Sequence, residues 1–187
     1  MEFADHEKEA KKKGIGGGGM FKFESGENRF RILSKAAHNG SHYVNGKLTN
    51  CTGDETCPLC KSKAQLSHKA LCYIYDYKTG LTMANLPWSV YRGIGELATH
   101  TDWKFEGLPP YDIVVNKTGE AKETRYSVMP TNAKDPIDEK VLAELKKKKT
   151  PEEIVQGWID KVKPQHESCD DILEDEVKTD LPWEDNK

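Results

Sequence analysis

Four side chains that can bind a metal ion lie between residues 42 and 60 of the chain. They follow the order His42-x8-Cys51-x5-Cys57-x2-Cys60. Structural zinc sites are closed tetrahedra of thiolates and imidazoles, and three cysteines with one histidine form a standard set. The spacing therefore predicts one structural zinc ion bound by His42, Cys51, Cys57 and Cys60.

Two local signals indicate how the chain could assemble this site. Cys57-Pro58-Leu59-Cys60 can form a tight knuckle that offers two thiolates to one ion. Asn45-Gly46 favours a two-residue hairpin turn, which would set His42 opposite Thr49. The hairpin would then bring the histidine beside the strand that leads to the first cysteine.

The same residues also allow alternatives. His38 or His68 could replace His42 as the fourth ligand, although no turn motif brings either of them to the thiols.

Two catalytic interpretations of the cysteines can be compared with the sequence. A nucleobase deaminase requires a His-x-Glu motif and a proline before the Cys-x-x-Cys pair, whereas Pro58 lies inside that pair. A thioredoxin-like dithiol would begin a helix in a βαβ unit, which the surrounding hairpin signals disfavour. Because four protein ligands leave no open position for water, we expect a protein that is not an enzyme.

Alternating apolar and polar residues predict strands between Met20 and Met129. The clearest patterns are Asn28–Leu33, Leu71–Tyr77, Tyr111–Val115 and Thr124–Val128. The last two flank a turn signal at residues 117–119 and predict a hairpin. One helix is predicted after Pro87, because Val90, Ile94 and Leu97 fall on one face.

Helical signals follow Pro130 and place C-terminal helices at about residues 135–163. Asp135-Pro136 is predicted to open the first helix, and Thr150-Pro151-Glu152-Glu153 is a capping box that opens the second. Several short strands with one inserted helix predict an α+β fold, mainly β with helices, built as a small closed or partly closed barrel. This folded core would span residues 20–164 and include a zinc subdomain at about 36–70.

The two ends of the chain differ from this core. Residues 1–19 contain four lysines and end in four glycines, a composition that predicts a flexible basic arm. Residues 165–187 carry a net charge of −7, so the other 164 residues carry +4. This polarity predicts a disordered acidic tail and a basic body that binds a polyanion. The sequence lacks an apolar run of membrane length or a secretion signal, so we expect a cytoplasmic protein without a membrane partner.

Cations and aromatic rings on the predicted strand faces suit an unpaired nucleic-acid strand, because cations neutralise phosphates and rings stack on bases. We expect single-stranded DNA contacts from Arg29, Arg31, Lys35, Tyr73, Tyr75, Tyr77, Lys78, Trp88, Tyr91, Lys117, Arg125 and Tyr126. The three strand tyrosines could instead form an outer barrel face or a second core layer under the helices. Arg29 and Arg31 could be ordinary solvated positions, and Trp88 could be a core residue.

Together these motifs resemble the single-stranded DNA-binding proteins of tailed phages, the helix-destabilising type with an oligonucleotide-binding (OB) fold and an integral zinc subdomain. The resemblance covers roughly residues 20–130 and the tail. It rests on Gly26–Leu33, on the order of His42, Cys51, Cys57 and Cys60, on Tyr73–Asp76, and on Asp112–Gly119 followed by Thr124–Tyr126. The zinc loop of this chain is short for that family.

The resemblance implies an OB barrel with an inserted zinc subdomain, in a protein that coats single-stranded DNA without sequence specificity during replication, recombination and repair. It implies that the acidic tail recruits replication or recombination proteins. The residues of the tail themselves predict an anchor at Asp180, Leu181, Pro182 and Trp183, although the tail could instead mimic a nucleic-acid chain electrostatically or be a solvated segment. The resemblance also implies self-association on DNA through the basic N-terminal segment, in the cytoplasm of a phage host. The alternative function is a zinc-containing adaptor of a polymerase or transcription complex that acts through its acidic tail.

Overall fold

The computed structural model describes residues 19–44, 46–53, 57–133 and 135–162 of the chain. These residues fall into two compact units. The sheet unit comprises residues 19–38 and 68–153, and the hairpin unit comprises residues 39–67 and 154–162. The predicted basic arm, apart from Gly19, and the predicted acidic tail with its anchor at residues 180–183 lie outside the described residues.

The chain forms one open, mostly antiparallel sheet. The strands are β1 (Gly26–Ile32), β2 (Ala37–Val44), β3 (Lys47–Asn50), β4 (Leu66–Asp76), β5 (Gly80–Pro87), β6 (Asp112–Thr118) and β7 (Arg125–Thr131). Their order is β3-β2-β4-β1-β6-β7, and β5 pairs with β4. Among the described strands no ladder joins β5 to β7, so the sheet is not a closed barrel. The predicted α+β class is confirmed.

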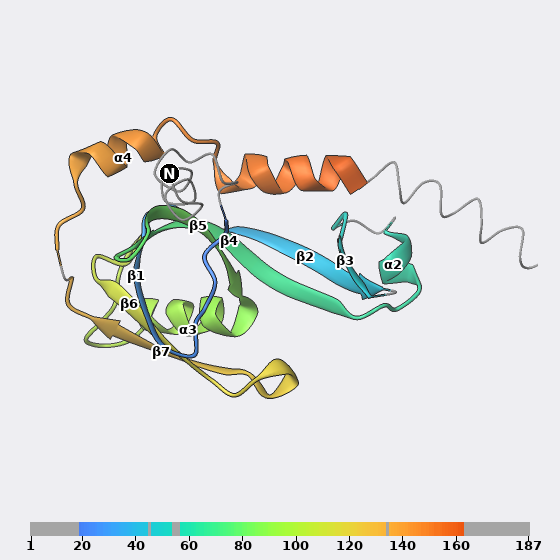
Figure 1. Ribbon diagram of the computed structural model, residues 1–187, viewed down its shortest axis with the longest axis horizontal. Coiled ribbons are helices and arrows are strands. Elements are labelled where there is room, and N and C mark those ends of the chain that lie inside the picture. Colours follow the sequence, from blue (N-terminus) through green and yellow to red (C-terminus); the bar gives the residue numbers. More distant parts are fainter. Residues whose placement is uncertain (1–18, 45, 54–56, 134, 163–187) are drawn as a thin grey trace, which may run out of the picture. The chain divides into compact units, whose positions relative to one another are not determined.

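The strands of the sheet unit follow a Greek-key order (Figure 1). β1, β4 and β5 are neighbours in the sheet. β6 follows after a long connection that contains α3 (Trp88–Ala98), and it pairs with the other side of β1. This arrangement, in which a fourth strand returns to lie beside the first, defines a Greek key. β7 then pairs with β6, which confirms the predicted late hairpin.

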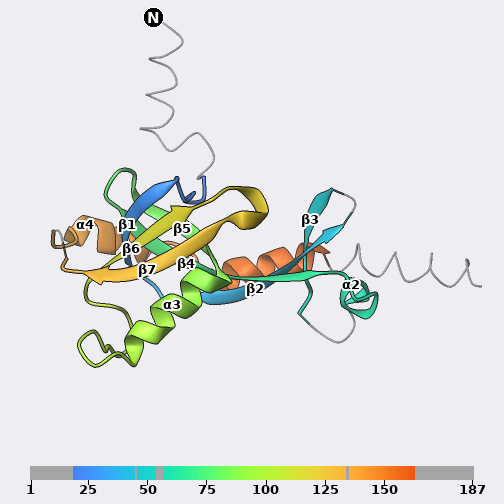
Figure 2. The same ribbon diagram turned by 90° about the horizontal axis from the view of Figure 1, so that it is seen from below.

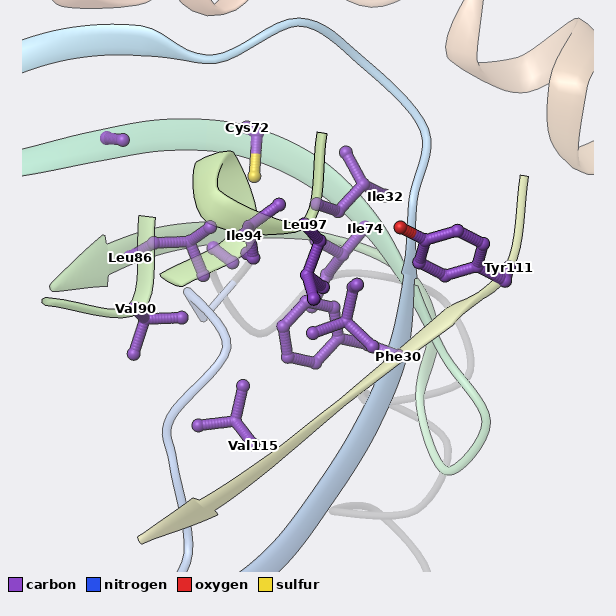
Figure 3. Packing of buried hydrophobic residues seen from close by; sticks show 13 residues of the cluster. Phe30, Ile32, Cys72, Ile74, Leu86, Val90, Ile94, Leu97, Tyr111 and Val115 are labelled. Carbon is purple, nitrogen blue, oxygen red and sulfur yellow. The ribbon is translucent and has the colours of Figure 1, made fainter. Parts of the chain in front are cut away.

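The apolar core of the sheet unit lies between these strands and α3 (Figure 3). Its members include Phe30, Ile32, Cys72, Ile74, Val115 and, from α3, Val90, Ile94 and Leu97. Alternate residues of a strand face opposite sides of the sheet. The predicted alternation in β1 is confirmed, because Phe30 is fully buried while Arg29 remains partly exposed. The predicted apolar face of α3 is confirmed as well.

Two non-strand segments contact the edge strands β5 and β7. Helix α3 contacts both of them, and a Cβ added at Gly93 would lie 2.9 Å from a side chain of β7. Ahead of β1, the Phe21 N–H donates to the Met83 carbonyl at 2.7 Å. The Phe23 ring lies edge-on to Tyr126, with centroids 5.3 Å apart. These contacts connect two edge strands that share no ladder.

The hairpin unit contains most of β2, together with β3 and α2 (Pro58–Lys61) (Figure 2). The register sets His42 opposite Thr49, as the turn signal predicted. Gly46 has a φ of +79°, the left-handed conformation that favours glycine in a tight hairpin turn. The predicted hairpin is therefore confirmed.

Helix α4 (Glu139–Leu145) begins later than predicted. It was predicted to begin at Asp135-Pro136, but the side chain of Asp138 accepts a 2.8 Å hydrogen bond from the N–H of Lys140. A side-chain acceptor for an unsatisfied N–H of the first turn fixes the start of a helix. The cap at Asp138 therefore sets the boundary.

A last helix covers residues 151–162. The Glu153 N–H donates to the Thr150 Oγ1 at 3.2 Å, and the Thr150 N–H donates to the Glu153 carboxylate at 2.8 Å. These reciprocal bonds confirm the predicted capping box. None of the described helices is long and apolar enough to cross a bilayer.

Candidate metal centre and candidate nucleic-acid surface

His42, Cys51, Cys57 and Cys60 lie together in the hairpin unit. Their potential ligand atoms all fall within 4.8 Å of one another. The Cys51 Sγ lies 3.8 Å from the Cys57 Sγ and 3.5 Å from the Cys60 Sγ. The His42 Nε2 lies 3.7 Å from the Cys57 Sγ and 3.4 Å from the Cys60 Sγ. The fold thus brings together the four residues whose spacing predicted a metal site.

These separations match the edges of a metal-centred tetrahedron. Metal–sulfur bonds of about 2.3 Å and metal–nitrogen bonds of about 2.0–2.1 Å give tetrahedral edges of about 3.8 Å between two sulfurs and about 3.6 Å between sulfur and nitrogen. The four observed separations range from 3.4 to 3.8 Å. The cluster can therefore hold one metal ion with all four side chains as ligands.

Backbone hydrogen bonds fix the elements that carry these ligands. The Cys51 N–H donates to the Gly40 carbonyl at 2.9 Å, which ties the chain after β3 to β2. The Lys61 N–H donates to the Cys57 carbonyl at 3.0 Å and closes the single turn of α2. Pro58 occupies the start of this turn, where its missing N–H would have no intrahelical partner. The predicted knuckle is therefore one helical turn.

Two further polar contacts reinforce the ligand atoms. The His42 Nδ1 lies 3.3 Å from the Ala64 carbonyl oxygen. Because the Nε2 faces the thiols, a proton on the Nδ1 can be donated to this carbonyl, which fixes the tautomer and the ring plane. The Gly53 N–H donates to the Cys51 Sγ at 3.3 Å, and such a bond favours the thiolate.

The thiols of Cys51 and Cys57 differ in acidity. Burial raises the pKa of Cys51 to about 12. Burial also opposes ionisation of Cys57, but hydrogen bonds from the backbone of Cys60 and Thr52 outweigh it and lower the pKa of Cys57 to about 6. Cys57 therefore loses its proton before Cys51 does, and a cation in the cluster would favour the thiolate form of Cys51.

His38 and His68, the alternative ligands, contact each other instead. The His38 Nε2 lies 2.9 Å from the His68 Nδ1, and the two rings are stacked with centroids 5.0 Å apart. The Trp88 ring lies edge-on to His38 at 5.4 Å. Burial, followed by the charge of His68, lowers the pKa of His38. Of the described histidines, His42 is the one that lies with the thiols.

A buried carboxylate contacts three of the residues predicted to bind DNA. Asp112 is 0% exposed, and it accepts hydrogen bonds from the Arg29 Nε at 2.9 Å and the Arg31 Nε at 2.7 Å. The Tyr77 hydroxyl donates to the same carboxylate at 3.0 Å. A phosphate would have to compete with Asp112 for these groups. No role was predicted for Asp112, although an acidic residue at the start of an apolar strand was an available signal.

The three predicted tyrosines of β4 and its end have different surroundings. Tyr73 is 5% exposed, and its hydroxyl donates to the Lys149 carbonyl at 3.0 Å. The burial of Tyr73 agrees with the alternative prediction, in which the strand tyrosines form a second packed layer, and not with an open strand face. Tyr75 and Tyr77 are half-buried and meet edge to face with centroids 5.3 Å apart.

The remaining predicted residues of the strands and turns lie elsewhere on the sheet unit. Lys78 forms an exposed ion pair with Glu24 at 2.6 Å. The Lys117 Nζ donates to a backbone carbonyl at 3.2 Å. Arg125 is exposed, whereas Tyr126 is partly buried against the core.

Trp88 and Tyr91 form an exposed aromatic pair at the start of α3, which we call the aromatic platform. They are 43% and 38% exposed, and their ring centroids lie 5.4 Å apart with the planes at 36°. Both line a cavity of about 680 Å³ between the β1–β2 connection, α3 and residues 105–109. Lys35, Arg92 and Glu96, all exposed, also line this cavity, whose other walls are mainly apolar. Arg92 and Glu96 form an exposed ion pair at 3.7 Å. The alternative that Trp88 belongs to the core is therefore wrong. Arg92 was not among the residues predicted to bind DNA.

Comparison of the chain with protein-family models, curated proteins and solved structures finds no match. The resemblance to phage single-stranded DNA-binding proteins therefore stays a prediction.

Proposed function

We propose that the chain binds unpaired DNA without reading its sequence and that the aromatic platform is the centre of the binding surface. The observation that carries this proposal is an exposed Trp88–Tyr91 pair beside a large cavity with Lys35 and Arg92 at its walls. Aromatic rings stack on bases, with about 1–3 kcal/mol for each stacked base, and cations bind the phosphates. An unpaired strand exposes both base faces and phosphates, whereas a duplex keeps its base faces stacked.

The strand order supports a partly open OB barrel as the fold behind this surface. An OB fold is a five-stranded, partly open Greek-key barrel that binds oligonucleotides with the face of its second and third strands and with two loops. The sheet unit has five main strands in Greek-key order, and α3 contacts both edge strands, β5 and β7. In this interpretation the hairpin unit is mostly an insertion between the first and second barrel strands, β1 and β4.

We also propose that the metal ion is zinc and that it is structural. Thiolate and imidazole ligands suit zinc, and three cysteines with one histidine form a closed structural set. Four protein ligands leave no position for an activated water, which supports a binding protein rather than an enzyme. The role of the ion would be to stabilise the hairpin unit.

The test is a binding titration of the full chain with a fluorescently labelled oligo-dT, followed by anisotropy at several salt concentrations. Affinity should fall steeply with salt, because cations of the protein release counterions from the strand. Trp88→Ala and Tyr91→Ala should each weaken binding by about 5- to 150-fold, the equivalent of one stacked base. Leu142→Ala removes a similarly exposed apolar side chain from α4 and should leave the affinity unchanged.

Three results would contradict the proposal. These are an affinity that does not respond to salt, an equal or higher affinity for duplex DNA of the same length, and unchanged binding by both platform variants. Metal analysis of the same preparation should give one zinc ion per chain.

A further inference from the structure

Tyr43 and Leu48 are the most exposed large apolar side chains among the described residues, at 67% and 59%. The register of β2 and β3 sets them directly opposite each other. Directly opposed residues of an antiparallel pair project to the same face, and their neighbours along each strand project to the other. His42 and Thr49 are those neighbours, and His42 belongs to the metal cluster. The hairpin thus has one face toward the metal cluster and one exposed apolar face.

The metal cluster holds both strands that carry this pair. β3 is an edge strand of four residues that pairs with β2, and so short a ladder gives little stability of its own. His42 directly precedes Tyr43 in β2, and Cys51 directly follows β3. An ion bound to both His42 and Cys51 would tie the two strands to one point. The Tyr43 ring would then be presented from a rigid support.

The size of this face and the charge of the described residues in 39–67 indicate what it binds. A stable protein partner buries about 800 Å² on each side, which two side chains at a hairpin cannot supply, whereas one aromatic ring matches one base. Lys47, Lys61 and Lys63 are exposed and are the only Lys, Arg, Asp or Glu residues in the described part of 39–67. The two acidic residues of this segment, at 54–55, lie outside the described residues. A base of a negatively charged strand therefore fits better than an apolar protein surface.

We propose that Tyr43 stacks on a base of an unpaired DNA strand, with Leu48 beside the ring. The inference rests on the function proposed above and gives the hairpin unit a binding role of its own. The metal ion then sets part of the DNA affinity, because it holds the hairpin that presents Tyr43.

The experiment compares the metal-loaded full chain with Tyr43→Ala, Tyr43→Leu and Tyr43→Phe, using the labelled oligo-dT. Tyr43→Ala and Tyr43→Leu should both weaken binding by about 5- to 150-fold, because leucine keeps apolar area but has no aromatic face. Tyr43→Phe keeps the ring and should bind like the wild type. The metal content of each variant is measured in parallel and should stay at one ion per chain.

Metal removal provides the second arm. A chelator should weaken binding by the wild type at least as much as Tyr43→Ala does, and it should weaken Tyr43→Ala by a smaller factor. This non-additivity is expected because the chelated hairpin no longer presents residue 43. Equal factors in the wild type and in Tyr43→Ala would overturn the link between the ion and the tyrosine.

The outcomes separate this inference from the function on which it rests. No binding of oligo-dT by the wild type would overturn both. Wild-type binding with unchanged affinity in metal-loaded Tyr43→Ala and Tyr43→Leu would overturn the inference alone. The same unchanged affinity together with loss of self-association in sedimentation would assign Tyr43 to a protein contact and likewise overturn it.

Discussion

The sheet unit and the hairpin unit are stabilised by different interactions. The sheet unit buries large apolar side chains from several strands and from α3, with Phe30, Ile74 and Ile113 fully covered. In the hairpin unit the most deeply buried side chains include His42 and Cys57, which belong to the metal cluster. Burial of apolar surface can stabilise the sheet unit. In the hairpin unit the most deeply buried groups are instead polar side chains and thiols.

The apolar core and an ion bound by the cluster would therefore be separate sources of stability in one chain. Metal binding energy becomes folding energy when the site does not exist in the unfolded chain. The hairpin unit consists of a short hairpin, a single-turn helix and part of the last helix, and its described residues bury few apolar side chains, so it should depend on the ion. The sheet unit should not.

The largest expected effect comes from removing the metal. Structural zinc contributes about 10 kcal/mol or more to the folding of small zinc domains, so Cys57→Ser or a chelator should abolish the protection of amides in β2 and β3. Hydrogen exchange resolved by mass spectrometry measures this. Amides of β1 and β6 should stay protected, because these strands belong to the sheet unit.

Cys72→Ala is the matched control for the cysteine variant. Cys72 is buried in the core, and burial raises its pKa to about 12, so it is a thiol without a metal role in this account. The variant should keep one metal ion and the protection of β2 and β3. If metal removal also abolished the protection of amides in the sheet unit, both units would depend on the ion, which would contradict the difference between them.

A smaller effect is expected from the charged group buried in the sheet unit. Asp112→Asn removes the negative charge that faces Arg29 and Arg31, and breaking a buried ion pair typically costs about 3–5 kcal/mol. Urea unfolding of the sheet unit should show a loss of about 3 kcal/mol, with metal content unchanged. Glu24→Gln, in an exposed pair with Lys78, should leave stability almost unchanged, because solvent screens the two charges. If Asp112→Asn and Glu24→Gln lowered the stability equally, the buried Asp112 carboxylate would contribute no more than an exposed one.

The smallest effect concerns the histidine pair beside the aromatic platform. Burial and the charge of His68 lower the pKa of His38 from its usual value of 6.5. The unfolded chain therefore binds this proton at a higher pH than the folded chain, so stability should fall as pH drops below 6.5 toward the lower folded pKa. Urea unfolding between pH 7.5 and about 5 should show this fall, and His38→Gln should make it smaller. A fall of the same size in His38→Gln would assign the pH dependence to other groups.

Local signals predicted much of the hairpin unit and of the helix starts. Asn45-Gly46 predicted the register of β2 and β3, and the spacing of His42 and three cysteines predicted the cluster. Thr150 and Glu153 form the expected capping box. These features depend on residues close in sequence, whose geometry a short motif determines.

Long-range contacts explain what the sequence analysis could not predict. Arg29 and Asp112 are 83 positions apart, and the Tyr73 hydroxyl reaches a carbonyl 76 positions away. No local pattern distinguishes an arginine that faces solvent from one that faces a buried carboxylate. The cavity beside Trp88 and Tyr91 likewise forms only when distant segments meet, and Arg92 has no motif that marks it.

Photocrosslinking would show whether an unpaired strand contacts the aromatic platform. The metal-loaded chain would be irradiated with an oligonucleotide that carries 5-iodouracil, and the crosslinked residues would be identified by mass spectrometry. We expect crosslinks at Trp88 or Tyr91 and further crosslinks at Tyr43. Efficient crosslinks confined to other residues, such as those of α4 and residues 151–162, would contradict this expectation.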